Sequence, residues 1–289
     1  MLKMKVVLLL VAGGTVCASI SAAEDAGELP MKPLWELGVG AGVRHGPDYP
    51  ASSERHLRGL ALPVVIYRGD VFRIGDGQAA RAVAFENERI ELDLSFDAAF
   101  DAESEKNERR SGMPDLDYMF QVGPQLKIHL QDFTYADNSR ARLILALQAR
   151  GVFSTDLRDV DQHGYVFEPM IRYRHYGWLS PNLDATLSIR PLWASKQLHE
   201  YFFDVAPAFV TIDRPLYESE SGYFGTGVNL YGNYRVSEKL SMFLGVQTTF
   251  HQGAANEESP LFEKKFTTGV TAGFVWSLRT SSRMVSAPD

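Results

Sequence analysis

The sequence predicts an all-β protein, an antiparallel transmembrane β-barrel of about 12 strands, within a range of about 10–14, that follows a cleaved signal peptide. Three observations predict it: an export signal, long segments in which apolar and polar residues alternate, and no later run of about 18 apolar residues that could form a membrane-spanning helix. In residues 89–100, RIELDLSFDAAF, every second residue is apolar and most of the others are charged. Such a strand has one face for lipid and one for a polar lumen.

The first 23 residues have the organisation of a secretion signal. Two lysines precede an apolar run at 6–16, and Ser21-Ala22-Ala23 supplies small residues for a cleavage site. We therefore expect a signal peptide at 1–23 and an outer-membrane β-barrel at 24–289. The expected location is the cell outer membrane, where lipid is the first partner of the outward faces.

Charge and cysteine content narrow the possible partners. Lys3 and Lys5 would leave with the signal, so the 36 acidic residues would give the exported chain a net charge of −9, which disfavours nucleic acid. Cys17, the only cysteine, would be removed with the signal peptide. We therefore expect the exported chain to have no disulfide and no cysteine metal site. The seven histidines are scattered singly and no G-x-S-x-G motif occurs. We therefore expect no catalytic, metal or cofactor site, and no enzyme.

Twelve segments fit strands joined alternately by short inner turns and long outer loops. They are 35–44, 57–67, two within 71–85, 89–100, 118–131, 140–153, 165–176, 182–193, 223–234, 240–251 and 266–278. Gly75-Asp76-Gly77 supplies a turn for the hairpin within 71–85. Because inner turns must be separated by an even number of strands, 194–222 is predicted to be one large outer loop, and Pro207 disfavours a central strand within it. Pro124 is expected to mark a bulge.

A periplasmic β-sandwich is the alternative to a membrane barrel. The predicted segments are about 10–14 residues long, whereas strands of soluble proteins average about five or six residues. Overall hydropathy is mildly polar although 45% of the residues are hydrophobic, as expected when apolar and polar positions alternate. Both observations favour the barrel.

Alternation assigns many charged side chains to the inside of the barrel. The basic ones are Arg142, Arg150, Arg172, Arg174, Arg190 and Lys127, and the acidic ones are Glu91, Asp93, Asp97, Glu168 and Asp184. Because buried charges need partners, their near balance predicts ion pairs across the lumen that narrow the bore. The alternative is a selective channel in which Arg142, Arg150, Arg172 and Arg174 form a ladder for small anions.

The loop at 46–53 is the most distinctive one in the sequence. Two prolines restrict the backbone around Asp48 and Tyr49. We expect these two residues to form a constriction at the barrel mouth, to contact a partner, or to belong to a cap that seals the rim.

Three stretches carry a family resemblance: LGVGAGVRHGPDYPASS at 37–53, LPVVIYRG at 62–69 and SPLFEKK at 259–265. They resemble the MipA/OmpV family of Gram-negative outer-membrane proteins, although Ala51 stands where the family pattern usually has glycine. The resemblance implies a scaffold that brings a murein hydrolase, a lytic transglycosylase, together with a murein synthase on the periplasmic side. The alternative function, from the lumen charges, is a narrow small-solute channel of the outer membrane.

Overall fold

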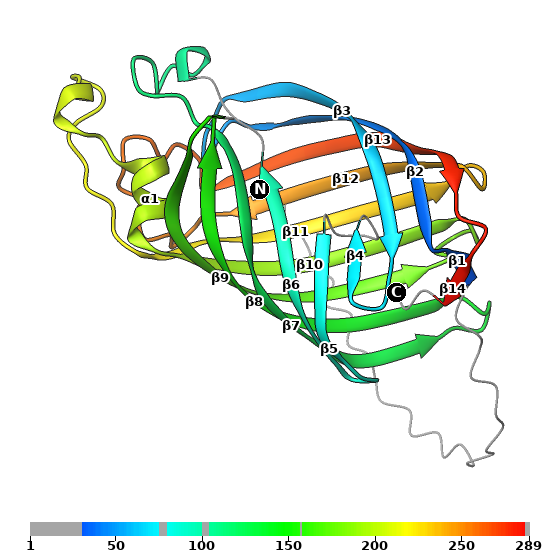
Figure 1. Cartoon of the computed structure of the whole chain (residues 1–289). Helices are drawn as coiled ribbons and strands as arrows, with labels where there is room; N and C mark the ends of the chain where they lie inside the picture. Colours follow the sequence, from blue (N-terminus) through cyan, green and yellow to red (C-terminus); the bar gives the residue numbers. More distant parts are fainter. Residues whose placement is uncertain (1–30, 75–79, 100–103, 157, 287–289) are drawn as a thin grey trace, which may run out of the picture.

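Alternating residues build long antiparallel strands that close on themselves. The computed structural model describes residues 31–74, 80–99, 104–156 and 158–286, and twelve of its strands form a closed barrel (Figure 1). These are β2 (Trp35–Pro47), β3 (Arg55–Arg68), β4 (Phe72–Ile74), β5 (Ala80–Glu86), β6 (Ile90–Ala99), β7 (Tyr118–Thr134), β8 (Arg140–Thr155), β9 (Val160–Tyr176), β10 (Leu183–Ala194), β11 (Gly222–Arg235), β12 (Leu240–Phe250) and β13 (Phe266–Thr280). The predicted barrel and its strand number are confirmed.

The remaining elements lie at the two ends of the barrel. β1 (Met31–Pro33) and β14 (Met284–Ser286) form a separate two-stranded sheet at one end. η1 (Ser104–Lys106), α1 (Lys196–Phe203) and η2 (Pro207–Phe209) belong to the loops of the other end. No helix of the described residues is long and apolar enough to cross a membrane.

Each barrel strand pairs with the next along the chain, and β13 closes the barrel on β2. The predicted hairpin within 71–85 is present as β4 and β5, which pair at Ile74 and Ala80, while its turn at Gly75-Asp76-Gly77 lies outside the described residues. The segment 195–221 is one loop without a barrel strand, as parity required. The predicted signal at 1–23 also lies outside the described residues.

The two faces of the strands differ as the alternation predicts. On β6, Leu92 and Leu94 point outward and are exposed, whereas Asp93 between them is 2% exposed and faces the lumen. Outward apolar residues of neighbouring strands face each other in the ladder. Leu94 lies opposite Pro124, and Leu126 lies opposite Leu147. The outside of the barrel is thus an apolar surface for lipid.

The ladder between β7 and β8 omits Gly123 and Pro124 and then continues in the same register. The predicted bulge at Pro124 is therefore wrong, and the register shift of this strand pair lies between His129 and Gln131. Proline has no N–H to donate, so a ladder can skip it without the insertion of a residue.

Candidate functional site

Loops at the outer end form a cap with its own hydrophobic core. The cap consists of the loops at 48–54, 104–117, 195–221 and 251–265, and it lies opposite the end that carries β1 and β14 (Figure 1). Its core, with the strand ends beneath it, contains Tyr49, Ala51, Leu116, Met119, Val152, Val166, Ala194, Leu198, Phe202, Phe203, Val205, Phe224 and Leu261. Burial of each large apolar side chain contributes about 1.5–3 kcal/mol. The loops therefore hold one another over the barrel mouth.

Asp48 and Tyr49 of the first loop are both buried in this cap. The Tyr49 hydroxyl donates a hydrogen bond of 2.8 Å to the carbonyl of Leu261. Burial, with the nearby Glu263 carboxylate, raises the pKa of Tyr49, so the phenol stays a neutral donor. The Asp48 carboxylate accepts hydrogen bonds from Arg58 Nη2 at 2.8 Å and from Asn107 Nδ2 at 3.0 Å. The first loop thereby connects β3 to the second outer loop.

The backbone conformation of Ala51 explains why the family pattern has glycine at this position. Its φ is 64°, in the left-handed region that costs an L-residue about 1–2 kcal/mol. The Ala51 amide donates to Nε2 of His251 at 3.2 Å, and Nδ1 of His251 lies 3.3 Å from the carbonyl of Phe224. Burial lowers the pKa of His251, so the neutral ring can accept on one nitrogen and donate on the other.

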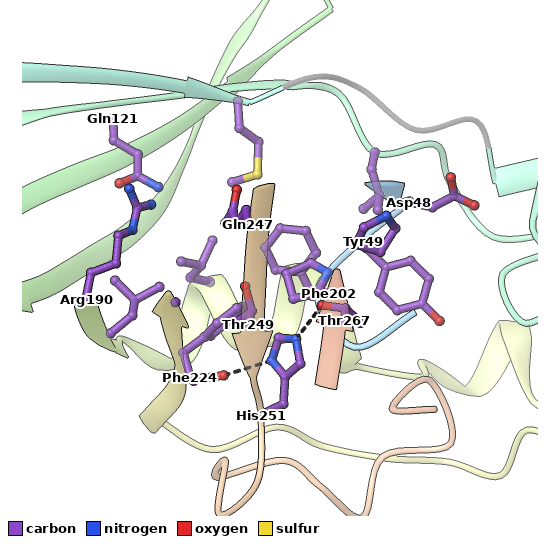
Figure 2. A pocket seen from close by; sticks show the side chains of 18 of the residues that line it. Asp48, Tyr49, Gln121, Arg190, Phe202, Phe224, Gln247, Thr249, His251 and Thr267 are labelled. Atoms are coloured by element: carbon purple, nitrogen blue, oxygen red, sulfur yellow. Dashed lines mark hydrogen bonds between the residues drawn. The ribbon is translucent and has the colours of Figure 1, made fainter. Parts of the chain in front are cut away.

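A cavity of about 420 Å³ lies directly beneath the cap. Figure 2 shows Gln121 and Arg190 on one side of it and Asp48 and Tyr49 on the other. The remaining lining is Arg44, Pro47, Pro50, Leu116, Asp117, Met119, Glu168, Leu192, Leu198, Phe202, Phe224, Gly225, Gly227, Gln247, Thr249, His251, Thr267 and Thr271. The cavity thus has an aromatic roof from the cap and a polar floor from the lumen.

The charged lumen residues predicted from the sequence form ion pairs along the wall. Lys127 of β7 lies 3.1 Å from Glu91 Oε1 and 2.7 Å from Asp93 Oδ2, both on β6. Glu168 of β9 pairs with Arg150 of β8 at 3.1 Å and with Arg190 of β10 at 3.2 Å. We name the lumen face of β6 to β10 the charged wall.

The other predicted arginines are less buried. Arg142 pairs with Asp132 at 2.8 Å, near the inner end of β7 and β8. Arg174 lies 3.5 Å from Asp184 and 4.5 Å from the ring centroid of Tyr176. Arg172 Nη2 lies 3.7 Å from the sulfur of Met170. All these ion pairs join neighbouring strands, because the register places opposite charges side by side. The predicted pairing across the lumen is therefore wrong.

A second lumen surface was not predicted from the sequence. Arg58 points inward, because it reaches Asp48 in the cap, so alternation also places Leu60, Leu62, Val64 and Ile66 on the lumen face. Leu60 and Leu62 are 45% and 47% exposed. The opposing residues of β2 are Gly42, Gly40 and Gly38. We name this surface the apolar wall; the available signal was the run LALPVVI at 60–66, which is apolar on both faces.

Comparison with known proteins identifies a family. The family model of the MltA-interacting protein MipA matches residues 39–278. A search of curated proteins finds no match. Among solved structures, an outer-membrane channel from Pseudomonas putida F1 has 10% identity, 88% coverage of this chain, 99% of that chain and a TM-score of 0.34. A bacterial polysaccharide outer membrane secretin has 10% identity, with 86% of this chain and 99% of that chain covered and a TM-score of 0.35. A FadL homologue from Pseudomonas aeruginosa has 9% identity, with 85% of this chain and 90% of that chain covered and a TM-score of 0.30.

Proposed function

The chain belongs to the MipA family of outer-membrane barrel proteins, and from this premise we propose that it is a scaffold for murein-remodelling enzymes on the periplasmic side. The family name denotes interaction with MltA, and this membership is the observation that carries the proposal. In this role the barrel anchors a murein hydrolase and a murein synthase in the outer membrane, and it performs no catalysis itself. The partners would bind the rim that faces the periplasm.

The rim that carries β1 and β14 supports the proposal. The turns at this rim are short, and in outer-membrane barrels the end with the short turns faces the periplasm. Here β1 and β14 pair from Met31–Ser286 to Pro33–Met284, and Arg68 of β3 donates to the carbonyl of Pro33 at 2.8 Å. The small sheet adds surface to turns that are short by themselves. A standard interface needs about 800 Å² per partner, so this added surface favours a docking role for the rim.

Capture of purified MltA by the immobilised full-length barrel tests the scaffold. The rim carries exposed apolar side chains at Leu179, Val236 and Met284. Their joint replacement by serine should weaken capture by at least about tenfold, because central apolar contacts carry most of an interface's binding energy. The matched control replaces Val210 and Ile212, which are exposed on the outer loops, by serine. Equal capture by both variants, or none by the wild type, would contradict the scaffold.

A narrow small-solute channel is the second candidate, and the cavity beneath the cap favours it. Conduction would require a path past the aromatic roof of this cavity, so we expect the intact protein to conduct little in planar bilayers. Replacement of 197–218 by a short glycine-serine linker should raise conductance at least about tenfold, because it removes Phe202 and Val205 from the cap core. Unchanged conductance in a variant that still folds would count against the channel.

A further inference from the structure

The cavity beneath the cap contains an arginine that has no counter-ion among the described residues. Arg44 of β2 lines this cavity and lies directly opposite Arg58 of β3 in the ladder. Arg58 is held by the Asp48 carboxylate at 2.8 Å. Arg44 itself forms no hydrogen bond or ion pair with another described residue. A charge withdrawn from water needs a partner, and a second cation beside it increases this need, so Arg44 favours an anion in the cavity.

The acidic residues of the cavity lining do not supply this anion. Glu168 is paired with two arginines of the charged wall, and Asp48 is paired with Arg58. The remaining acidic residue, Asp117, directly precedes β7. In strand order β7 lies on the opposite side of the barrel from β2, separated from it by β3 to β6 in one direction and by β8 to β13 in the other. The described lining therefore leaves the charge of Arg44 to a ligand.

Glycines make room for the guanidinium of Arg44 at the cavity wall. A Cβ at Gly46 would lie 3.4 Å from Nε and 3.5 Å from Cζ of Arg44, and a Cβ at Gly269 would lie 3.8 Å from Nε. The guanidinium thus lies over the backbone of β2 and β13. Thr271, the ladder partner of Arg44, is a small polar neighbour in the same lining. Because the planar fork of arginine can donate two parallel hydrogen bonds to a carboxylate, this end of the cavity suits a carboxylate ligand.

The roof of the cavity is apolar and aromatic. α1 supplies Leu198 and Phe202, and β11 supplies Phe224. The ring centroids of Phe202 and Phe224 are 5.9 Å apart, and Figure 2 shows both rings in the lining together with Thr249 and Thr267. Another aromatic ring can join such a pair, because rings attract each other at centroid distances of about 4.5–7 Å. The volume of about 420 Å³ is within the usual range of small-molecule sites, about 300–1,000 Å³.

We propose that this cavity binds a small aromatic monocarboxylate, of the size of benzoate or naphthoate. Its carboxylate accepts hydrogen bonds from Arg44, and its ring packs against Phe202 and Phe224. One cation without a counter-ion calls for a single negative charge, and the aromatic roof calls for a ring. The site does not depend on the scaffold role, because it lies within the barrel and not on the rim.

Calorimetric titration of the full-length protein in detergent micelles with 2-naphthoate tests the proposal. We expect saturable binding of about one molecule per barrel, as a single cavity of this size allows. The matched probe is 2-naphthamide, which has the same ring and no charge. It should bind at least about tenfold more weakly, because it cannot form a charged pair with Arg44. Equal affinity for the two probes, or no saturable binding of 2-naphthoate, would overturn the proposal.

Substitution of Arg44 tests the carboxylate contact. Arg44→Gln should lower the affinity for 2-naphthoate at least about tenfold and leave that for 2-naphthamide unchanged. Arg44→Lys should bind more tightly than Arg44→Gln, because it keeps the charge and loses only the fork. The matched control is Arg142→Gln, which removes the same charge from a lumen arginine outside the cavity and should bind as the wild type does. Equal losses in Arg142→Gln and Arg44→Gln would overturn the assignment of Arg44.

A cavity-filling substitution tests the place of binding. Thr249→Phe puts a ring into the lining and should abolish binding of both probes. The matched control is Thr248→Phe, because alternation along β12 turns this neighbouring side chain outward and away from the cavity. Unchanged binding of 2-naphthoate by Thr249→Phe would place the ligand elsewhere and overturn the proposal. Heat-modified migration on gels identifies the variants that are folded barrels.

Competition distinguishes an aromatic acid from a bare anion. Benzoate should displace 2-naphthoate, whereas inorganic phosphate should displace it at least about tenfold less effectively, because phosphate cannot contact the aromatic roof. If phosphate displaces 2-naphthoate as well as benzoate does, the site binds anions without regard to a ring, and the proposed ligand class is wrong.

Discussion

The charged wall and the apolar wall enclose one lumen but are stabilised in opposite ways. On β6 to β9 the side chains of Asp93, Lys127 and Glu168 are almost fully buried and held in ion pairs. On β3 the side chains of Leu60 and Leu62 are nearly half exposed and have glycines opposite them in the ladder. One side of the barrel is therefore filled and the other is open.

The difference shows that the two walls of one barrel depend on different interactions. A buried charge that loses its partner is costly, so the charged wall tolerates little movement. Apolar side chains beside glycine carry no charge that needs a partner, so substitutions of similar size are expected to cost less there. The stability of the barrel is therefore expected to depend more on the charged wall than on the apolar wall.

The largest expected effect is the loss of the cation of the charged wall. Lys127→Met would leave Glu91 and Asp93 buried side by side, and we expect the free energy of unfolding to fall by about 3–5 kcal/mol. Urea titration of the protein refolded in vesicles measures this. Leu62→Met on the apolar wall is the control, with an expected change below about 1.5 kcal/mol. Similar losses in the two variants would remove the distinction between the walls.

Arginine substitution distinguishes the lipid face from the lumen face. Leu94 and Leu62 are both 47% exposed, but Leu94 faces lipid and Leu62 faces the lumen. Leu94→Arg should destabilise the barrel by about 2–4 kcal/mol, as arginine does near the bilayer midplane. Leu62→Arg should cost much less, because the lumen admits water. The same titration in vesicles decides, and a larger loss for Leu62→Arg would mean that the apolar wall faces lipid.

Two arginines that the sequence treats as equivalent should differ in effect. The Arg150 and Glu168 side chains are 4% and 3% exposed, so Arg150→Gln should cost about 1–3 kcal/mol. The Asp132 partner of Arg142 is 66% exposed, so Arg142→Gln should cost less than about 1 kcal/mol. Unfolding midpoints in urea compare the two variants. If Arg142→Gln costs more, burial does not govern the strength of these pairs.

The smallest effects should come from single methyl groups on β2 and β3. At Gly40 a Cβ would lie 2.8 Å from Val64 Cγ2, and Gly40→Ala should destabilise by about 1 kcal/mol through overpacking. At Gly59 the nearest atom would be 3.7 Å away, so Gly59→Ala should be neutral or stabilise by about 0.4–1 kcal/mol. Thermal unfolding monitored by circular dichroism would show whether each variant is less or more stable than the wild type. A stabilising Gly40→Ala would show that Val64 can move away from Gly40 at little cost.

Much of the barrel follows from local patterns in the sequence. Alternation within a strand is decided by neighbours two residues apart, so the faces of Leu92, Asp93 and Leu94 and the twelve strands were predictable. The even number of strands required between inner turns correctly predicted that 195–221 forms a single outer loop. The family pattern of glycine at position 51 corresponds to a left-handed backbone, which Ala51 adopts here.

The sequence by itself determined the number of strands and the inward direction of the side chains of the charged wall, because these depend on a period of two along the chain. Only the tertiary structure decided how those side chains meet. Register, and not alternation, places Lys127 beside Asp93 and Arg150 beside Glu168. Residues far apart in the sequence, such as Tyr49 and Leu261, are also joined in the cap. These contacts depend on how strands align when the barrel closes, and a local pattern contains no information on that alignment.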